Sequence, residues 1–368
     1  MTKEVNKFIW FDFFRGMAAF VVLIGHLRAL VFKDFVPTNS IFEKGFYFIT
    51  GFGHQAVVVF FVLSGFFIVR SIEKSVEKNK WSYKDYSINR ITRLWIVLIP
   101  ALFMSLLLDN IGLFYFSDAY TYSGQILSLP TMNPTDQLGI SVFFGNLFFT
   151  QNILTTVYGS NGPLWSLAYE FWYYVLFPLA YFAFIKHYSL TIKIISGILF
   201  FLVLFFVGKV IAIYFIVWLF GGVAYLVVER ELFIKKYILA KAIIITGVFV
   251  GLLAAIRIGI SPLLFNDFSL GIITACLLCV FSQVEMKSDF LRKVTDFFSE
   301  ISYTLYLTHF SFAVLLITIF QKQRIEFNIT NFGVFIGFFL IILLYSFLMW
   351  FLFEKNTHKI KKWLKSKV

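Results

Sequence analysis

Long apolar segments recur along this chain, and they constrain the fold more than any other feature of the sequence. Runs of about 18 or more mostly apolar residues are long enough to cross a bilayer as α-helices. Hydrophobic residues make up 60% of the 368 positions and charged residues only 14%, which leaves too little polar surface to cover a soluble domain. The runs are continuous and do not alternate, which favours helices over a β-barrel. We therefore predict an all-α polytopic membrane protein.

About ten transmembrane helices are expected, one for each apolar run. The expected spans are residues 8–32, 52–71, 94–110, 164–185, 190–208, 210–228, 241–258, 268–285, 300–320 and 332–353. Most of the 32 Lys and Arg residues then fall in alternate connecting segments, which is the pattern of cytoplasmic loops. We expect both termini in the cytoplasm, a single transmembrane domain over residues 1–353 and a basic cytoplasmic tail over residues 354–368 that lies on anionic lipid headgroups.

The segment between the third and fourth expected spans, residues 111–163, contains no Lys or Arg. This composition is expected on the translocated side of the membrane. Residues 138–154 within it are apolar but short, and a full span there would reverse the side of every later loop. We therefore expect a re-entrant or interfacial helix in this outer segment, which is long enough to form a lid.

Charge and cysteine content exclude other classes of protein. The formal net charge of +12 is spread over the loops, where the positive-inside bias explains it, so nucleic acid is not an expected partner. Cys276 and Cys279 lie in one apolar run, which argues against a disulfide framework and a structural zinc site. No His-rich metal-ligand spacing is present, so no metal is expected. Nothing in the sequence selects an oligomeric state.

Arg15 and His26 are polar residues within the first apolar run. Eleven residues make almost three helical turns, so the two side chains project from nearly the same face, about 16 Å apart along the axis. Arg15 is either a snorkelling side chain near the inner end or a clamp for an anionic or carbonyl-bearing group. His26 either hydrogen-bonds to a neighbouring helix or acts as a general base. We favour the functional interpretation of both.

Two arginines stand at the cytoplasmic mouth of the third expected span. Arg90 and Arg93 belong to the most basic internal loop, and residues 84–93 are expected to form a short helix at the membrane face. At i and i+3 the two side chains would share one side of that helix. They are either ordinary positive-inside anchors or a fork that binds phosphate through bidentate hydrogen bonds. Their spacing is compatible with both.

The second expected span contains Ser64 and Gly65, and close helix packing is the expected role of both small residues.

The fourth span begins with the richest polar cluster of the chain. Glu170 lies about two turns into the membrane, where a carboxylate is costly. It is either the structural partner of another intramembrane polar group or part of a site. The neighbouring Trp165, Ser166, Tyr169 and Trp172 make the wall of a site the better interpretation.

A second polar patch lies in the ninth expected span. Its members are Ser302, Tyr303 and His309. Hydrogen bonds that satisfy these side chains between helices explain the patch at least as well as a function does. Glu354, which ends the tenth span, is expected to be an anchor at the inner surface.

Taken together, these motifs resemble membrane-bound acyltransferase family 3, the bacterial proteins that O-acylate surface glycans. The matching features are Arg15-x10-His26, Phe60 to Ile68, Arg90-x-x-Arg93, Pro163 to Leu167 with Glu170, Ile301 to Tyr303 with Tyr306, Leu307 and His309, and the closing Phe353-Glu354. Each motif is weak alone, but six in this order and spacing are specific. The family's usual proline two residues after the closing Glu is missing, because Asn356 stands there.

The resemblance implies transfer of an acyl group, most often acetyl, from cytoplasmic acyl-CoA to a hydroxyl of a cell-surface or lipid-linked glycan on the outer side of a bacterial cytoplasmic membrane. Arg90 and Arg93 would hold the CoA phosphates, and Arg15 would line the path of the pantetheine arm. His26 would take the acceptor proton, directly or after carrying the acyl group. Glu170 would orient His26 or bind the sugar, and the α-helical aromatic residues around it, Trp165, Tyr169 and Trp172, would stack on a pyranose.

Two other classes of function remain open at this point. A proton-coupled transporter or flippase for a lipid-linked saccharide would use Arg15, His26 and Glu170 as a relay, although the chain lacks the inverted repeats and paired broken helices of many transporters. A non-catalytic membrane partner in an envelope-synthesis complex is the third possibility. Transfer of label from acetyl-CoA to a glycan would distinguish an acyltransferase from both the transporter and the non-catalytic partner.

Overall fold

The computed structural model of the chain is helical, and it describes residues 8–37, 39–122, 134–184, 188–232, 236–259 and 263–367. Seven helices within these residues are long and apolar enough to cross a membrane, judged by length and composition. The predicted class, an all-α polytopic membrane protein, is thereby confirmed. The number of ten spans and the cytoplasmic position of both termini stay predictions.

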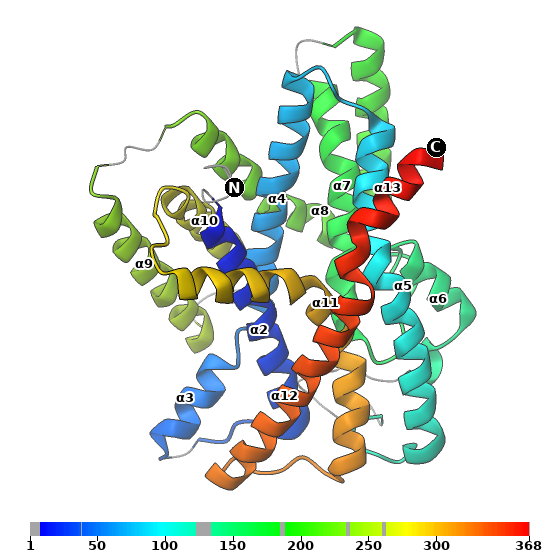
Figure 1. The fold of residues 1–368 in the computed structure, drawn as a ribbon, viewed down its shortest axis with the longest axis vertical. Helices are drawn as coiled ribbons and strands as arrows, with labels where there is room; N and C mark the ends of the chain where they lie inside the picture. Colours follow the sequence, from blue (N-terminus) through cyan, green and yellow to red (C-terminus); the bar gives the residue numbers. More distant parts are fainter. Residues whose placement is uncertain are drawn as a thin grey trace. The chain divides into compact units, whose positions relative to one another are not determined.

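Every expected span coincides with a helix (Figure 1). The longer helices are α2 (Ile9–Val31), α4 (Gly53–Glu77), α5 (Tyr83–Phe116), α7 (Trp165–Phe184), α8 (Leu190–Glu229), α9 (Ile238–Ile258), α10 (Leu263–Phe281), α11 (Asp289–Phe320) and α12 (Ile329–Leu352). Shorter helices are α3 (Ile41–Ile49), α6 (Ile140–Leu147) and α13 (Thr357–Lys367), with single 3₁₀ turns at Pro134–Gln137, Gly162–Leu164 and Glu354–Asn356.

The fifth and sixth expected spans are joined without a loop. Residues 190–208 and 210–228 form the single element α8, which is 40 residues long. A straight helix of that length would be twice what the bilayer requires. Gly208 interrupts it with a φ of 78° and a ψ of 172°, a backbone conformation that glycine adopts without a steric penalty. The kink at Gly208 thus separates the two expected spans within one helix.

Two shorter segments differ from their expected form. Residues 84–93 are not a separate short helix, because they are the first turns of the continuous helix α5. The outer segment does contain a helix, but α6 covers only Ile140–Leu147, so the apolar residues that follow it are not helical. Its re-entrant or interfacial position stays a prediction. Residues 123–133 of this outer segment lie outside the described part of the chain.

The chain forms two compact units whose segments alternate along the sequence. Unit 1 comprises residues 1–15, 57–83 and 166–296, and unit 2 comprises residues 16–56, 84–165 and 297–368. The expected division into a domain over 1–353 and a tail stays a prediction. Helices α2, α4, α7 and α11 each contribute residues to both units.

Within unit 1, α4 and α8 approach until their backbones touch. A Cβ atom on Gly221 would lie 1.9 Å from the carbonyl oxygen of Val62, and a Cβ on Gly65 would lie 2.0 Å from that of Trp218. Only glycine fits at both places, as is common between transmembrane helices. The predicted packing role of Gly65 is confirmed. Helix α10 completes this part of the unit by packing against α8 and α9.

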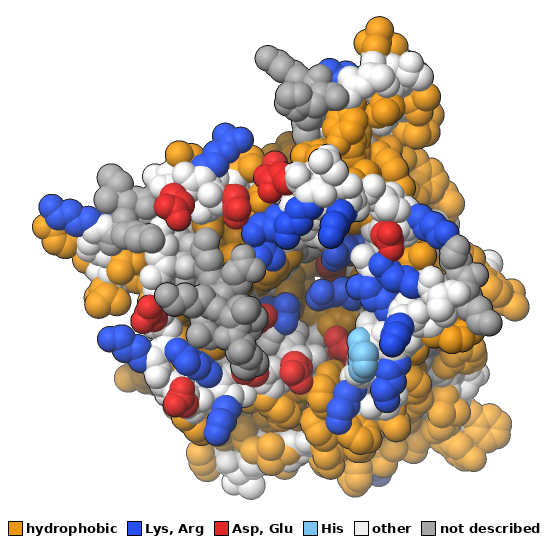
Figure 2. Space-filling view, turned by 45° about the horizontal axis from the view of Figure 1, so that its top comes forward, with side chains coloured by type: hydrophobic (Ala, Val, Ile, Leu, Met, Phe, Trp, Pro, Cys, Tyr) orange, Lys and Arg blue, Asp and Glu red, His pale blue; other side chains and the backbone are white. Residues whose placement is uncertain are grey.

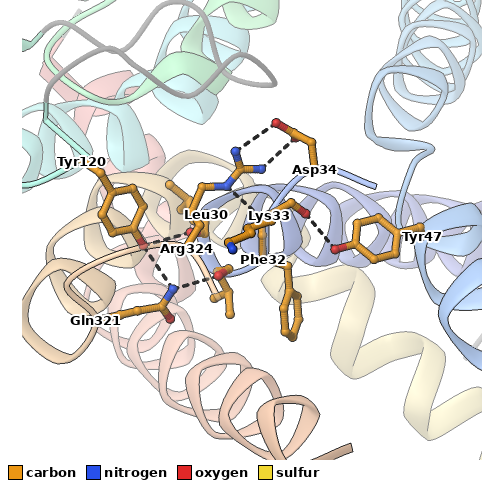
Figure 3. A network of polar contacts seen from close by, with 9 residues as sticks. Leu30, Phe32, Lys33, Asp34, Tyr47, Tyr120, Gln321 and Arg324 are labelled. Carbon is orange, nitrogen blue, oxygen red and sulfur yellow. Dashed lines mark hydrogen bonds and ion pairs between the residues drawn. The ribbon is translucent and has the colours of Figure 1, made fainter. Parts of the chain in front are cut away.

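Within unit 2, a polar network closes the C-terminal end of α2 (Figure 3). Arg324 forms a bidentate pair with Asp34 at 2.7 and 3.0 Å and donates from Nε to the Phe32 carbonyl. Gln321 donates to the Val31 carbonyl at 2.8 Å, and Tyr120 donates to that of Leu30 at 3.0 Å. These bonds satisfy carbonyl groups that have no partner inside the helix. Burial raises the pKa of the Tyr120 phenol, and Arg324 opposes that rise, so the phenol keeps its proton at neutral pH.

The surface carries both signs of charge together with large apolar areas. Many Lys and Arg side chains are exposed on the face drawn in Figure 2, with fewer Asp and Glu side chains among them. Large hydrophobic side chains are exposed along α8, α9 and α12, including Phe205, Ile243 and Leu344. Exposed apolar helix faces of this extent are what lipid contact requires.

Candidate active site

His26 of α2 contacts a second histidine, His309 of α11, within unit 2. His26 Nδ1 lies 3.0 Å from His309 Nε2. The rings are nearly parallel, with an interplanar angle of 9° and centroids 5.3 Å apart. His309 is fully buried, whereas His26 is half-buried. Two imidazoles joined in this way can hold a proton at a defined nitrogen, which suits acid–base chemistry.

The backbone beside His26 leaves little space for movement. A Cβ atom on Gly25 would lie 3.0 Å from the carbonyl oxygen of Thr50, the residue that ends α3. The ring of Phe310 stands edge-on to that of His26, with centroids 4.9 Å apart. The backbone of α2 is therefore held close to Thr50 beside His26, and the ring of Phe310 walls one side of the imidazole.

Hydrogen bonds join the loop that precedes α7 to α11 next to His309. The amide of Asn161, which is fully buried, donates to the Leu307 carbonyl at 2.9 Å and to the Ser105 hydroxyl at 3.2 Å. The Tyr306 hydroxyl donates to the Pro163 carbonyl at 3.2 Å. Buried polar groups satisfied in this way fix one arrangement of the backbone. The turn of residues 161–163 thus packs against α11.

Glu170 lies in unit 1 and accepts hydrogen bonds from neighbours on two helices. Tyr174, one turn further along α7, donates its hydroxyl to Glu170 Oε1. Ser64 of α4 donates to the same oxygen at 3.3 Å, and its own oxygen accepts from Trp218 Nε1 at 3.2 Å. Ser64 therefore does more than pack, and the expectation of a packing role alone is wrong. His26 belongs to unit 2, so the expected contact between Glu170 and His26 stays a prediction.

Arg15 is paired with an acidic residue of its own helix. Its Nη2 atom lies 2.9 Å from Asp12 Oδ1, and both side chains are part-exposed, at 27% and 33%. An i, i+3 pair of opposite charge neutralises an arginine that would otherwise be costly in an apolar segment. The pairing also leaves Arg15 partly accessible, as a clamp for an anionic group requires.

Arg90 and Arg93 share unit 2 with the basic helix α13. Arg90 is half-buried and Arg93 exposed. Lys361 of α13 interacts electrostatically with both arginines, and Lys365 of the same helix pairs with Asp85 at 2.5 Å. The predicted tail is thus helical, and it places a third cation near the two arginines. Repulsion among like charges falls when an anion binds beside them.

The four α7 side chains expected at the acceptor have different surroundings. They are Trp165, Ser166, Tyr169 and Trp172. Trp165 is half-buried and stacks on His54 at 6.4 Å. Tyr169 stacks on Phe61 at 6.1 Å and is 6% exposed. Ser166 is buried, and Trp172 lies against a phenylalanine of α8. Their role in sugar binding stays a prediction.

The second polar patch has separate functions in the fold. Ser302 donates to the Ser299 carbonyl of its own helix at 2.7 Å. Tyr303 donates to the Leu94 carbonyl of α5 at 3.0 Å. The bond of Tyr303 fits the expected hydrogen bonds between helices, whereas the bond of Ser302 stays within α11. His309 reaches another titratable group, His26. Glu354, expected as a surface anchor, instead accepts from the hydroxyl and amide of Thr304 in α11.

Sequence reasoning gave no role in a site to three residues that the geometry brings to these sites: Asn161, Tyr174 and Lys361. Tyr174 stands at i+4 from Glu170, a spacing that signals a side-chain pair on a helix. Asn161 directly precedes the Gly162-Pro163 turn, but its partners lie far away in sequence. Lys361 was assigned to lipid headgroups with the rest of the tail, and no local pattern links it to α5.

Comparison with known proteins identifies a family. A family model described as an acyltransferase domain, acyltransferase 3, matches residues 8–351, nearly the whole chain. No curated protein and no solved structure matches.

Proposed function

Because this chain belongs to the acyltransferase 3 family of multi-pass membrane acyltransferases, we propose that it moves an acyl group from cytoplasmic acyl-CoA to a hydroxyl of a glycan on the outer side. Acetyl is the proposed acyl group, and a cell-surface or lipid-linked glycan is the proposed acceptor. Acyl-CoA is the one co-substrate that this chemistry needs, and the proposed mechanism uses no metal. The proposed location is a bacterial cytoplasmic membrane.

The contact between His26 and His309 carries the proposal. It provides a half-buried imidazole whose orientation is fixed by a hydrogen bond at 3.0 Å. A glycan hydroxyl is a poor nucleophile until a base removes its proton, and histidine is suited to this at neutral pH. In the proposed step, His26 accepts the hydroxyl proton while the oxygen attacks the thioester carbonyl. The carbon–sulfur bond then breaks, and the CoA thiolate leaves and takes up the proton.

A two-step route uses the same residues. The imidazole of His26 itself would attack the thioester carbonyl and carry the acyl group before the acceptor arrives. Both routes end with an ester on the glycan and free CoA. They differ in whether a labelled acyl-protein accumulates when the acceptor is withheld.

The basic cluster of unit 2 is the proposed donor site. Arg90 and Arg93 would bind CoA phosphates through bidentate hydrogen bonds, and Lys361, which interacts with both, would add a third positive charge. CoA is a polyanion made in the cytoplasm, and the most basic internal loop is the one predicted to face it. Arg15 would line the path of the pantetheine arm.

The proposed acceptor site includes Glu170 and the aromatic start of α7. The carboxylate already accepts from Ser64 and Tyr174, so it is held in one orientation. A carboxylate held in this way is suited to bind a sugar hydroxyl or to orient the imidazole of His26. Trp165, together with Ser166, Tyr169 and Trp172, would shape the acceptor side.

Charge reversal tests the donor site. The double variant Arg90→Glu/Arg93→Glu should weaken acetyl-CoA binding at least about 10-fold, since two charge-assisted contacts are lost. Binding is measured on purified protein by isothermal titration calorimetry. The matched control is Lys78→Glu/Lys80→Glu, which changes the net charge equally at two exposed positions of the same loop. Equal affinity in both double variants would remove the arginine pair from the donor site.

A further inference from the structure

The hydrogen bonds of His309 define which of its nitrogens carries a proton. His309 Nδ1 lies 2.7 Å from the carbonyl oxygen of Leu305, one turn earlier in α11. A carbonyl only accepts hydrogen bonds, so Nδ1 of His309 must carry the proton and donate. Full burial of His309 favours the neutral ring, because an uncompensated charge is costly away from water. In a neutral ring with Nδ1 protonated, Nε2 bears the lone pair.

This assignment determines the tautomer of His26 as well. The atom that faces His309 Nε2 is His26 Nδ1, at 3.0 Å. Since His309 Nε2 accepts, His26 Nδ1 must be the donor. The lone pair of neutral His26 then resides on Nε2, the nitrogen directed away from His309. One backbone carbonyl thus sets the tautomers of two imidazoles in series.

We propose that His309 is a positioning residue that holds His26 in the tautomer with Nδ1 protonated, so that Nε2 of His26 is the atom that takes the acceptor proton. The catalytic part of this inference rests on the proposed acyl transfer. When His26 becomes an imidazolium, its Nδ1–H bond to His309 becomes charge-assisted and stronger. His309 stabilises that cation without taking the proton, because its own donor remains on the Leu305 carbonyl.

The segment of α11 around His309 is held firmly enough for this role. The Ser311 hydroxyl lies 2.9 Å from that of Ser105 in α5 and 3.1 Å from that of Ser160. The amide of Ser160 donates to Asp109 at 2.7 Å. All four of these side chains are buried. Together with the bond from Asn161 to Leu307, they fix the height and rotation of α11 two residues on either side of His309.

The sequence contains a hint of this arrangement but no proof. His309 is a titratable residue in the middle of an expected transmembrane span, which is unusual without a partner. Its partner lies 283 positions away, and no local periodicity connects the two. Only the placement of α2 against α11 shows that both histidines belong to one hydrogen-bonded series.

The test replaces His309 and measures both the tautomer of His26 and the reaction. In His309→Phe the ring volume is kept and the acceptor is removed, whereas in His309→Gln an amide oxygen can accept from His26 Nδ1. Thr308→Val is the control, since Thr308 Oγ1 donates to the Thr304 carbonyl of its own helix at 2.7 Å. The tautomer is read from nitrogen NMR of protein labelled at histidine, with His26→Ala used to assign the signals.

In the wild-type protein we expect a proton on His26 Nδ1 and none on Nε2. We expect His309→Phe to lower kcat at least about 100-fold, as loss of a correctly placed base does, with the KM for acetyl-CoA unchanged. His309→Gln should restore part of kcat, and Thr308→Val should leave both constants unchanged. A wild-type His26 protonated on Nε2, or an unchanged kcat in folded His309→Phe, would overturn the inference. If the wild-type protein transferred no acyl group, the proposed function would fail while the NMR result still decided the tautomer.

Discussion

At the residue scale, the proposed chemistry depends on polar side chains whose partners lie on other helices. Glu170 illustrates this, since one of its donors is at i+4 on the same helix and the other is Ser64 of α4. Hydrogen bonds to a charged group contribute about 1.5–3 kcal/mol, more than those between neutral groups. The charge of the carboxylate, and not only its shape, therefore matters for the site.

Glu170→Gln tests the charge while keeping the volume of the side chain. We expect acyl transfer to fall about 10- to 100-fold, which corresponds to the loss of about 1.5–3 kcal/mol of interaction with the carboxylate. Activity is measured in membranes that contain equal amounts of folded protein. The control is Glu285→Gln, at an exposed position, which should keep wild-type activity. Wild-type activity in both variants would limit Glu170 to a structural role.

The residues were easier to find in the sequence than their contacts. A charged or titratable residue in an apolar run is visible by itself because the bilayer makes it costly, and Arg15, His26 and Glu170 were found in this way. The pairing of His26 with His309 depends on the packing of helices that are distant in sequence. Ser64 was missed as a hydrogen-bonding residue because a small residue in a transmembrane helix usually serves packing.

At the element scale, hydropathy predicts where helices lie, and glycine determines how they meet. Hydropathy located a helix in each expected span because a helix in lipid must be apolar over about 20 residues. It did not distinguish a loop from a one-residue kink at Gly208, since both interrupt the helix over the same short stretch. The close approach of α4 and α8 is likewise invisible to hydropathy, because it depends on the absence of side chains at Gly65 and Gly221.

Gly221→Ala tests this packing. The new Cβ would lie 1.9 Å from the Val62 carbonyl oxygen, so α4 and α8 must separate, and overpacking of this kind costs about 1–3 kcal/mol or more. We expect a lower Tm and less folded protein in detergent. The control is Gly247→Ala in α9, where nothing lies within 4 Å of the new Cβ; it should keep or raise the Tm, since alanine favours a helix over glycine. Equal Tm values would contradict the close approach of α4 and α8.

At the scale of the whole molecule, the account requires a donor on one side of a membrane and an acceptor on the other. The charge distribution of the loops predicts which side each segment occupies. Ten spans return the chain to the side on which it began, whereas an odd number would not. The side of the C-terminal helix α13 is therefore critical, because Lys361 and the arginines of α5 form the proposed donor site.

Two separate fusions after Val368 test the topology, one to green fluorescent protein and one to alkaline phosphatase. Green fluorescent protein becomes fluorescent only when it folds in the cytoplasm, and alkaline phosphatase becomes active only on the outer side. We expect a fluorescent fusion in the first case and an inactive enzyme in the second, since the tail is basic and ten spans are predicted. An active phosphatase fusion would place α13 on the side away from acyl-CoA and would contradict the proposed donor site.

Transfer of label between the two substrates tests the central claim most directly. Inside-out membrane vesicles from cells that produce the wild-type protein or its His26→Ala variant are incubated with acetyl-CoA labelled in the acetyl group, and the glycan fraction is counted before and after mild alkaline hydrolysis. We expect alkali-labile label in the glycan for the wild-type protein, with a decrease of at least about 100-fold in the variant, as expected when a general base is removed. Equal label in the wild-type, variant and empty vesicles would contradict acyl transfer by this protein.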